Sequence, residues 1–224
     1  MEFRPRSAFY VSGCSMSGKT QFVFRLLKEK HTLFGQNAPH SILYCYGIYQ
    51  SLFDDMEREL DNFTLHEGIP SKETIDSLTA DRKHHIVVLD DLWKEVVNNP
   101  NMSDMFTMRC HHANISVVFL TQNLFPDGRY SRTIALNTSY MVLFKNVRDA
   151  SQITTLGKQM FPGHKDYLIS AYEDSVKRAY GYLVIDLGAN TDPKLRLKTN
   201  IFLEEQPVIV YLPRCVLLLC LSCI

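Results

Sequence analysis

The sequence has no excess of either charge, no regular cysteine framework and no apolar run long enough to cross a membrane. Lys plus Arg and Asp plus Glu both number 24, which excludes coating of a polyanion by overall charge but permits a local basic patch. The six cysteines follow no regular spacing and the first residues contain no apolar core, so we expect an intracellular soluble protein with reduced thiols. The apolar run at 215–224 is about half the length that a bilayer span needs, so we expect no membrane partner.

The composition that remains is that of a globular α/β protein. The chain has 224 residues, of which 46% are hydrophobic and 21% are charged. This length suits one α/β domain with a sizeable core. Short apolar runs alternate with longer amphipathic stretches, a pattern that predicts a mostly parallel sheet flanked by helices. We expect this domain to cover 1–212 and assign no role to the tail at 213–224.

The expected elements follow from the apolar periodicity. Five buried strands are expected at 8–11, 41–46, 86–89, 115–120 and 140–144. Helices are expected at 19–30, 103–112, 148–161 and 164–179, with weaker helical pieces and a loop in 50–84. The segments 180–187, 195–203 and 208–211 predict an added strand hairpin at the C-terminal side of the sheet.

A glycine-rich loop separates the first expected strand from the first expected helix. It fits G-x-x-x-x-G-K-[ST] with Gly13, Cys14, Ser15, Met16, Ser17, Gly18, Lys19 and Thr20. The two glycines allow backbone conformations that turn N–H groups toward phosphate oxygens. Lys19 offers a positive charge to the outer phosphates, Thr20 offers a hydroxyl to magnesium, and the helix adds its N-terminal dipole. The strand–loop–helix context therefore predicts a P-loop that binds ATP with Mg²⁺.

Two aspartates directly follow the apolar strand at 86–89. Asp90 stands at the Walker B position, where it would hold the magnesium shell, and Asp91 would orient or deprotonate the attacking water. The alternative is that both residues cap a helix that begins at Leu92, and one residue can serve both purposes. Adjacent carboxylates at the end of a buried strand are costly without a cation, which favours the metal site.

Gln122 ends the strand at 115–120 and can touch both the γ-phosphate and the attacking water; the alternative is a simple turn residue. The order of these elements is that of the additional-strand P-loop ATPases. In that group an inserted strand lies between the Walker A and Walker B strands, and we expect 41–46 to occupy that place. Nucleoside and nucleotide kinases share the loop, but their Arg-rich lid and base-proximal Asp-Arg or Glu-Arg pair are not evident here.

Several stretches resemble the FtsK/HerA-type packaging ATPases of viruses and virus-like transposons, in particular the Maverick/Polinton and adintovirus branch, which is related to poxvirus packaging ATPases. The similar stretches are 11–20, 88–92, 111–117, 119–137, 143–149, 161–163 and 180–183. Together they extend from about 8 to about 211, and the run T-Q-N-L-F-P at 121–126 is more specific than the glycine loop.

This resemblance implies an ATP-driven motor, a homo-oligomeric ring that moves double-stranded DNA into a capsid, with capsid proteins as partners and the host nucleus or the virion as its location. It also implies that a neighbouring subunit supplies an arginine to each active site. Candidates are Arg129, Arg132 and Arg148, of which we favour Arg132 or Arg148. Each could instead be solvated or contact DNA. The loop at 126–132 suits a phosphate backbone or a subunit interface.

One departure from that family concerns Asp91. Many members have Asp-Glu where this chain has Asp90-Asp91, and the shorter side chain holds water less well unless the backbone adjusts. Two other functions stay open. A nucleoside or nucleotide kinase would transfer phosphate to a small acceptor, and a non-catalytic ATP-binding remnant of a transposon would bind nucleotide without turnover.

Overall fold

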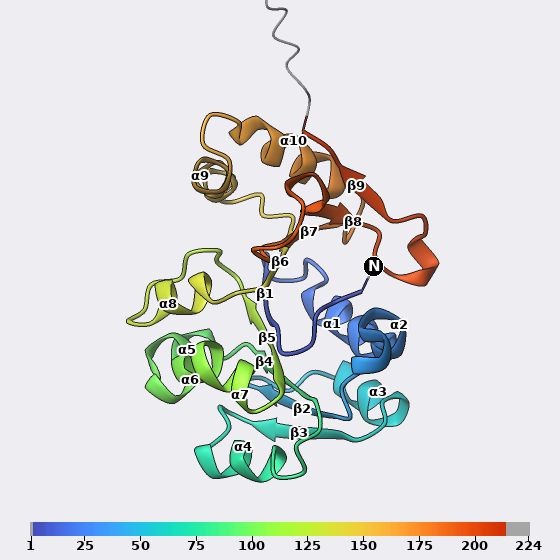
Figure 1. Cartoon of the computed structure of the whole chain (residues 1–224), viewed down its shortest axis with the longest axis vertical. Helices are drawn as coiled ribbons and strands as arrows, with labels where there is room; N and C mark the ends of the chain where they lie inside the picture. Colours follow the sequence, from blue (N-terminus) through green and yellow to red (C-terminus); the bar gives the residue numbers. More distant parts are fainter. Residues whose placement is uncertain (1, 214–224) are drawn as a thin grey trace, which may run out of the picture.

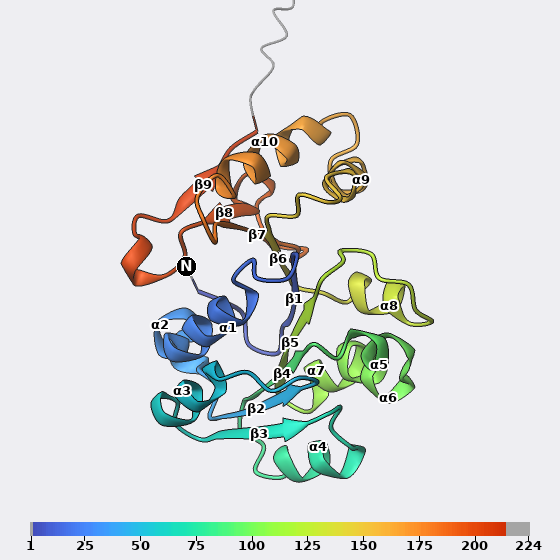
Figure 2. The same cartoon turned by 180° about the vertical axis from the view of Figure 1, so that it is seen from behind.

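One nine-stranded mixed sheet runs through the centre of the computed structural model, which describes residues 2–213 (Figures 1 and 2). The strands are β1 (Ala8–Ser12), β2 (Ser41–Tyr46), β3 (Phe63–Glu67), β4 (His85–Asp90), β5 (Ile115–Thr121), β6 (Tyr140–Phe144), β7 (Tyr182–Asp186), β8 (Leu197–Thr199) and β9 (Ile209–Tyr211). Their order across the sheet is β3-β2-β4-β5-β1-β6-β7-β8-β9. From residue 214 on, the expected tail at 213–224 lies outside the described residues.

The sheet has a parallel part and an antiparallel part. Strands β1 to β6 pair in parallel, which requires crossover connections of the kind that helices provide. Strands β7, β8 and β9 then extend the sheet beyond β6 in antiparallel pairing. The predicted parallel sheet with an added C-terminal strand hairpin is therefore confirmed.

Helices cover both faces of this sheet. They are α1 (Lys19–Lys28), α2 (Lys30–Phe34), α3 (Leu52–Glu59), α4 (Lys72–Leu78), α5 (Trp93–Asn98), α6 (Pro100–Asp104), α7 (Cys110–His112), α8 (Ser131–Leu136), α9 (Ser151–Met160) and α10 (Lys165–Ser175). A π-helical turn, η2 (Met105–Arg109), joins α6 to α7, and short 3-10 turns lie at η1 (Gly35–Asn37), η3 (Pro193–Leu195) and η4 (Leu203–Glu205). None of the helices within residues 2–213 combines the length and apolar character that a bilayer span requires.

The two faces of the sheet belong to two separate hydrophobic cores. Helices α1, α2 and α3 pack on one face, and α4 to α10 pack on the other (Figure 1). Successive side chains of a strand point to opposite faces, so Tyr10 of β1 enters one core while Phe9 and Val11 enter the other. Because both faces are buried, the central strands consist almost entirely of apolar residues.

Two expectations about the strands were wrong. The strand between β1 and β4 is β5, at 115–121, whereas 41–46 forms β2 and pairs with β4 on its outer side. Both segments are buried apolar runs, so their composition does not encode their order in the sheet. In addition, 63–67 forms the edge strand β3 inside a region expected to be helical, and its partial exposure hides the apolar signal.

Candidate nucleotide-binding site

The glycine loop lies at the carboxyl end of β1 and leads directly into α1. The Gly13 N–H donates to the Thr121 carbonyl at 3.2 Å, which ties the loop to the end of β5. A Cβ on Gly13 would lie 2.5 Å from Cβ of Phe144, and Gly18 has a φ of 101° in the left-handed region. Both positions therefore require glycine. Met16, at the tip of the loop, is 95% exposed.

Lys19 folds back over its own loop. Its ammonium donates to the carbonyl oxygens of Gly13 at 2.7 Å and Cys14 at 2.9 Å. Burial lowers the pKa of Lys19, and the negative charge of Asp90 opposes this effect. Nearby, the Ser17 hydroxyl is buried and has no hydrogen-bond partner among residues 2–213. A partly buried cation and an unpaired hydroxyl in a loop of this shape fit a triphosphate, which offers many acceptor oxygens.

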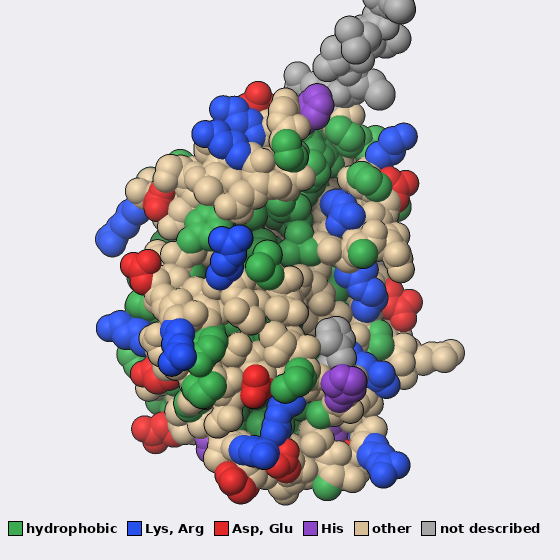
Figure 3. All heavy atoms as spheres, turned by 60° about the vertical axis from the view of Figure 1, so that its left-hand side comes forward, with side chains coloured by type: hydrophobic (Ala, Val, Ile, Leu, Met, Phe, Trp, Pro, Cys, Tyr) green, Lys and Arg blue, Asp and Glu red, His purple; other side chains and the backbone are tan. Residues whose placement is uncertain are grey.

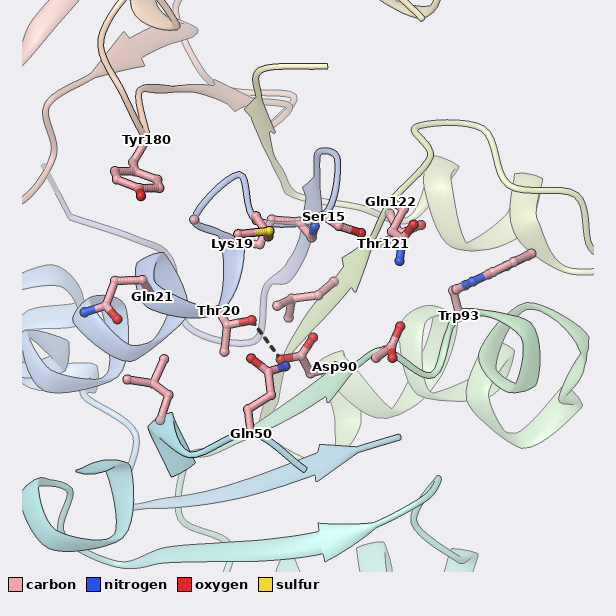
Figure 4. Close-up of a pocket in the computed structure, with 15 residues that line it drawn as sticks. Ser15, Lys19, Thr20, Gln21, Gln50, Asp90, Trp93, Thr121, Gln122 and Tyr180 are labelled. Atoms are coloured by element: carbon pink, nitrogen blue, oxygen red, sulfur yellow. Dashed lines mark hydrogen bonds between the residues drawn. The ribbon is translucent and has the colours of Figure 1, made fainter. Parts of the chain in front are cut away.

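Asp90, the last residue of β4, is held by hydrogen bonds from two other elements. The Thr20 hydroxyl donates to Asp90 Oδ2 at 3.2 Å (Figure 4), and the hydroxyl of the buried Tyr44, from β2, donates to the same oxygen at 2.8 Å. Burial raises the pKa of Asp90, while the hydrogen bonds from Tyr44 and Thr20 and the charge of Lys19 lower it. In the part of the chain described, Asp90 Oδ1 accepts no hydrogen bond.

This arrangement fits a magnesium ion. Mg²⁺ prefers hard oxygen ligands and is usually held by one or two protein groups, the rest of its shell being water and substrate phosphate. Thr20 and Asp90 supply such oxygens side by side, with Thr20 Oγ1 at 3.2 Å from Asp90 Oδ2. Within residues 2–213 no group of three or more His, Cys, Asp or Glu side chains could form an all-protein metal cage.

Asp91 takes a left-handed backbone conformation, with a φ of 56°, directly after β4. Gly47 makes room for it: a Cβ there would lie 2.5 Å from the Asp91 carbonyl oxygen, and the Gly47 N–H donates to the Asp90 carbonyl at 2.9 Å. Helix α5 begins only at Trp93, and no side chain caps its N-terminus. The alternative role of the two aspartates as helix caps is therefore wrong.

These groups surround a pocket of about 440 Å³ (Figure 4). Its walls are formed by Ser15, Met16, Gly18, Lys19, Thr20, Gln21, Gln50, Leu52, Asp90, Asp91, Trp93, Leu120, Thr121, Gln122 and Tyr180. The pocket thus brings together Lys19 and Thr20 from the start of α1, Asp90 and Asp91 from the end of β4, and Gln122 from the end of β5. Of the loop residues expected to bind nucleotide, Gly13, Cys14 and Ser17 do not line it; the Cys14 thiol instead donates to the Lys145 carbonyl at 3.2 Å.

The three candidate arginines lie outside this pocket. Arg129, Arg132 and Arg148 are exposed, and none of them lines it. The guanidinium of Arg129 stands 5.3 Å from the ring centre of Tyr130. Lys and Arg side chains are spread over the face that includes α8 and α9 rather than gathered in one patch, with hydrophobic side chains visible between them (Figure 3). Within one chain these arginines therefore face solvent.

Several residues at the site carried no recognisable signal in the sequence. Tyr44, Gly47, Gln50 and Trp93 reach the site through the order of the strands and the path of the loops. In Figure 4 the side chain of Gln50 points toward the pair formed by Thr20 and Asp90. Tyr180 belongs to one of the stretches that resemble the packaging ATPases, but the sequence assigns it no role.

No protein-family model matches the sequence, and a search of curated proteins finds no match. Solved structures do match. The genome-packaging NTPase B204 from Sulfolobus turreted icosahedral virus 2, in complex with ATP-γS, gives a TM-score of 0.56 at 10% identity, over 94% of this chain and 98% of that one. The same NTPase with AMPPCP gives 0.53 at 10% identity, over 93% and 98%.

A bacterial ATPase structure matches as well. EssC (ATPases 2 and 3) from Geobacillus thermodenitrificans gives a TM-score of 0.56 at 11% identity. The match covers 93% of this chain and 40% of the EssC chain. At these identities the likeness concerns the fold. The chain therefore has the P-loop NTPase fold, which it shares with a viral genome-packaging NTPase and with EssC ATPases.

Proposed function

We propose that this chain is an ATPase motor that uses ATP hydrolysis to move double-stranded DNA into a viral or virus-like capsid. The observation that carries the enzymatic part is the convergence of one cation, one hydroxyl, two carboxylates and one amide around a single pocket. They come from Lys19, Thr20, Asp90, Asp91 and Gln122. A triphosphate seated on the glycine loop would meet all five.

Each of these groups has a distinct task in the proposed reaction. The glycine loop and Lys19 would hold the β- and γ-phosphates, and Thr20 and Asp90 would hold Mg²⁺, which would neutralise charge on the phosphate oxygens. Asp91 and Gln122 orient a water against the γ-phosphorus. The new bond forms between this water and phosphorus while the bond to the β–γ bridging oxygen breaks, and Asp91 accepts the proton of the water.

The motor part of the proposal has separate support. B204 is a genome-packaging NTPase by its description, and its solved complexes hold ATP analogues. This chain matches it over nearly the full length of both chains, and it carries two exposed arginines, Arg132 in α8 and Arg148 in the segment after β6. We propose a homo-oligomeric ring in which Arg132 or Arg148 completes the site of a neighbour, with capsid proteins as partners and the nucleus or the virion as its location.

Measuring ATP hydrolysis with and without duplex DNA tests the proposal directly. The wild type should hydrolyse ATP, and duplex DNA should stimulate it. Lys19→Ala and Asp91→Asn should each lower the rate by about 10²–10⁴-fold, the range of a lost phosphate clamp or general base. Activity that DNA leaves unchanged would count against the motor, and phosphate transfer to a nucleoside in place of water would indicate a kinase.

A further inference from the structure

A second pocket of about 350 Å³ adjoins the one that holds the carboxylates. Gly18, Gln21 and Tyr180 line both pockets, so the two pockets adjoin at these residues. The second pocket, called the aromatic pocket below, is completed by Phe22, Arg25, Phe144 and Tyr182. Its wall is mainly aromatic and contains few polar groups, as in pockets that bind small molecules.

The direction in which a triphosphate lies in the phosphate site determines which end of the nucleotide reaches the aromatic pocket. Gln122 and Trp93 lie at one end of the site, and Gln21 and Tyr180 lie at the other (Figure 4). Asp91 also lines the site and precedes Trp93 by two residues in the chain. The terminal phosphate belongs beside the residues that would activate water. The nucleoside must therefore leave the glycine loop on the side of Gln21 and enter the aromatic pocket.

We propose that the aromatic pocket binds the base and ribose of the nucleotide, that the Tyr180 ring stacks on the base, and that the site accepts purine and pyrimidine bases alike. This inference rests on the proposed function only in that the triphosphate occupies the glycine loop. It adds the part of the ligand that the loop itself does not bind.

Tyr180 is placed as a stacking platform. Its side chain is 72% exposed although it is a large aromatic residue, and its φ of 60° lies in the left-handed region. A Cβ on Gly18 would lie 3.0 Å from Cδ1 of Tyr180, so the ring stands directly beside the glycine loop. The following residue fixes this position: the Gly181 N–H donates to the Arg178 carbonyl at 3.1 Å, and a Cβ on Gly181 would lie 2.3 Å from the Ser175 carbonyl oxygen.

The polar side chains of the aromatic pocket are poorly suited to distinguishing base edges. Arg25 is already occupied, since it donates to Glu205 at 2.6 Å and stands 4.1 Å from the ring centre of Phe202. Gln21 forms no side-chain hydrogen bond within residues 2–213 and is exposed. Its amide offers both a donor and an acceptor and can turn over, so it can pair with different bases. Stacking tolerates any base because each has a π-face.

The fluorescence of Trp93 provides a direct test, because it is the only tryptophan of the sequence and it lines the phosphate pocket. ATP, GTP, CTP and inorganic tripolyphosphate are titrated, with Mg²⁺, into the wild type, Tyr180→Ala and the matched control Tyr180→Phe. Each nucleotide should bind the wild type about tenfold more tightly than tripolyphosphate, and the three should agree within about tenfold. Tyr180→Ala should lose the nucleotide advantage but bind tripolyphosphate normally, and Tyr180→Phe should behave as the wild type.

The possible failures have different meanings. Unchanged ATP affinity in Tyr180→Ala would overturn the stacking role, and so would a loss of ATP affinity in Tyr180→Phe equal to that in Tyr180→Ala. A preference for one base by about 10⁴-fold, the level that edge-reading hydrogen bonds achieve, would overturn the indifference to base identity. If neither nucleotides nor tripolyphosphate bind the wild type, the proposed function fails together with this inference.

Discussion

The position of the Asp90 carboxylate depends on a tyrosine from a different strand. Tyr44 is buried, and its hydroxyl reaches the same carboxylate oxygen that the Thr20 hydroxyl reaches. Oδ2 is engaged twice, whereas Oδ1 accepts no hydrogen bond within residues 2–213. Groups that orient metal ligands in this way strongly affect metal affinity. Tyr44 is therefore a positioning residue for the proposed magnesium site.

Removing the Tyr44 hydroxyl should weaken the use of magnesium. In Tyr44→Phe, we expect the Mg²⁺ concentration for half-maximal ATP hydrolysis to rise by about tenfold, because the carboxylate loses one of its two hydrogen bonds. Nucleotide binding in the presence of a metal chelator, measured by Trp93 fluorescence, should stay unchanged. Tyr140→Phe is the matched control. Tyr140 is also buried, and its hydroxyl accepts a hydrogen bond of 3.2 Å from the Arg4 N–H, but it does not line the nucleotide pocket. An unchanged magnesium midpoint in Tyr44→Phe would contradict this role.

Gly47 leads to a second prediction at this scale. Its missing side chain allows the Asp91 backbone to approach, and a methyl group there would meet the Asp91 carbonyl oxygen at 2.5 Å. Gly47→Ala should therefore displace Asp91 and lower the rate of hydrolysis by about tenfold or more, while ATP still binds. Gly68→Ala serves as a control for lost stability alone, since a Cβ there has no neighbour within 4 Å and only its left-handed φ of 77° is strained. Equal rates for the two variants would show that Asp91 tolerates the shift.

The sequence revealed those site residues whose chemistry is local. A phosphate loop needs its glycines, lysine and threonine in one short run, so Lys19 and Thr20 could be found from spacing alone. Tyr44 and Gly47 could not be found in this way, because they act through contacts between strands that are far apart in the chain. The roles of Arg132 and Arg148 stay predictions, since they concern a second subunit.

Among the elements, β7 ends in an ion pair that holds the N-terminal segment. Asp186 accepts from the guanidinium of Arg4 at 2.7 Å and from the Gly188 N–H at 2.9 Å. Burial alone would raise the pKa of Asp186, but these hydrogen bonds and the Arg4 charge together lower it. A carboxyl group with a lowered pKa stabilises the fold above its unfolded pKa, and this contribution is lost as the pH falls through the folded value.

Asp186→Asn should accordingly lower stability in a pH-dependent way. At pH 7 we expect a loss of about 1 kcal/mol, a modest figure because Arg4 is partly exposed and water screens its charge. The difference from the wild type should shrink as the pH falls below about 4, where the wild-type carboxyl also becomes protonated. Urea unfolding at both pH values measures this. As a control, Glu59→Gln removes the charge from an exposed pair with Lys28 and should change stability less at either pH. If the stability loss of Asp186→Asn does not depend on pH, it does not come from the charge of Asp186.

The elements themselves were largely predictable, but their order in the sheet was not. Periodicity and apolar runs locate β1, β2, β4, β5 and β6, because strands buried on both faces have a strong apolar signal. The same uniformity makes the strands interchangeable in a sequence argument, which is why β2 was expected in the place that β5 occupies. Edge strand β3 was missed for the opposite reason, since its exposed residues weaken the pattern.

At the scale of the whole molecule, the proposed ring predicts that two inactive variants can rescue each other. Arg148→Ala or Arg132→Ala would keep its own nucleotide pocket but fail to complete the pocket of its neighbour. Lys19→Ala would fail to hold ATP productively but still present its arginines. A mixture should therefore regain hydrolysis by forming some complete sites, up to about a quarter of the wild-type rate if two equal pools mix at random at each boundary.

The measurement compares the rate of ATP hydrolysis by the mixture with the rates of the two variants alone. Arg129→Ala and Arg109→Ala are useful comparisons, the latter because Arg109 donates to Asp76 inside its own chain and lines neither pocket. Rescue with one arginine variant only would identify the residue that acts across the boundary. Full activity of both Arg132→Ala and Arg148→Ala on their own would exclude both candidates.

The place of β1 in the sheet has a consequence for folding during synthesis. This strand comes first in the chain, yet its two neighbours, β5 and β6, are synthesised more than a hundred residues later. Pairings so distant in sequence fold slowly, because a long loop must close before any contact is gained. On the ribosome, β1 therefore cannot pair until the first of these neighbours, β5, has emerged. The glycine loop that follows β1 therefore takes its final position only after residues more than a hundred positions further along the chain have been synthesised.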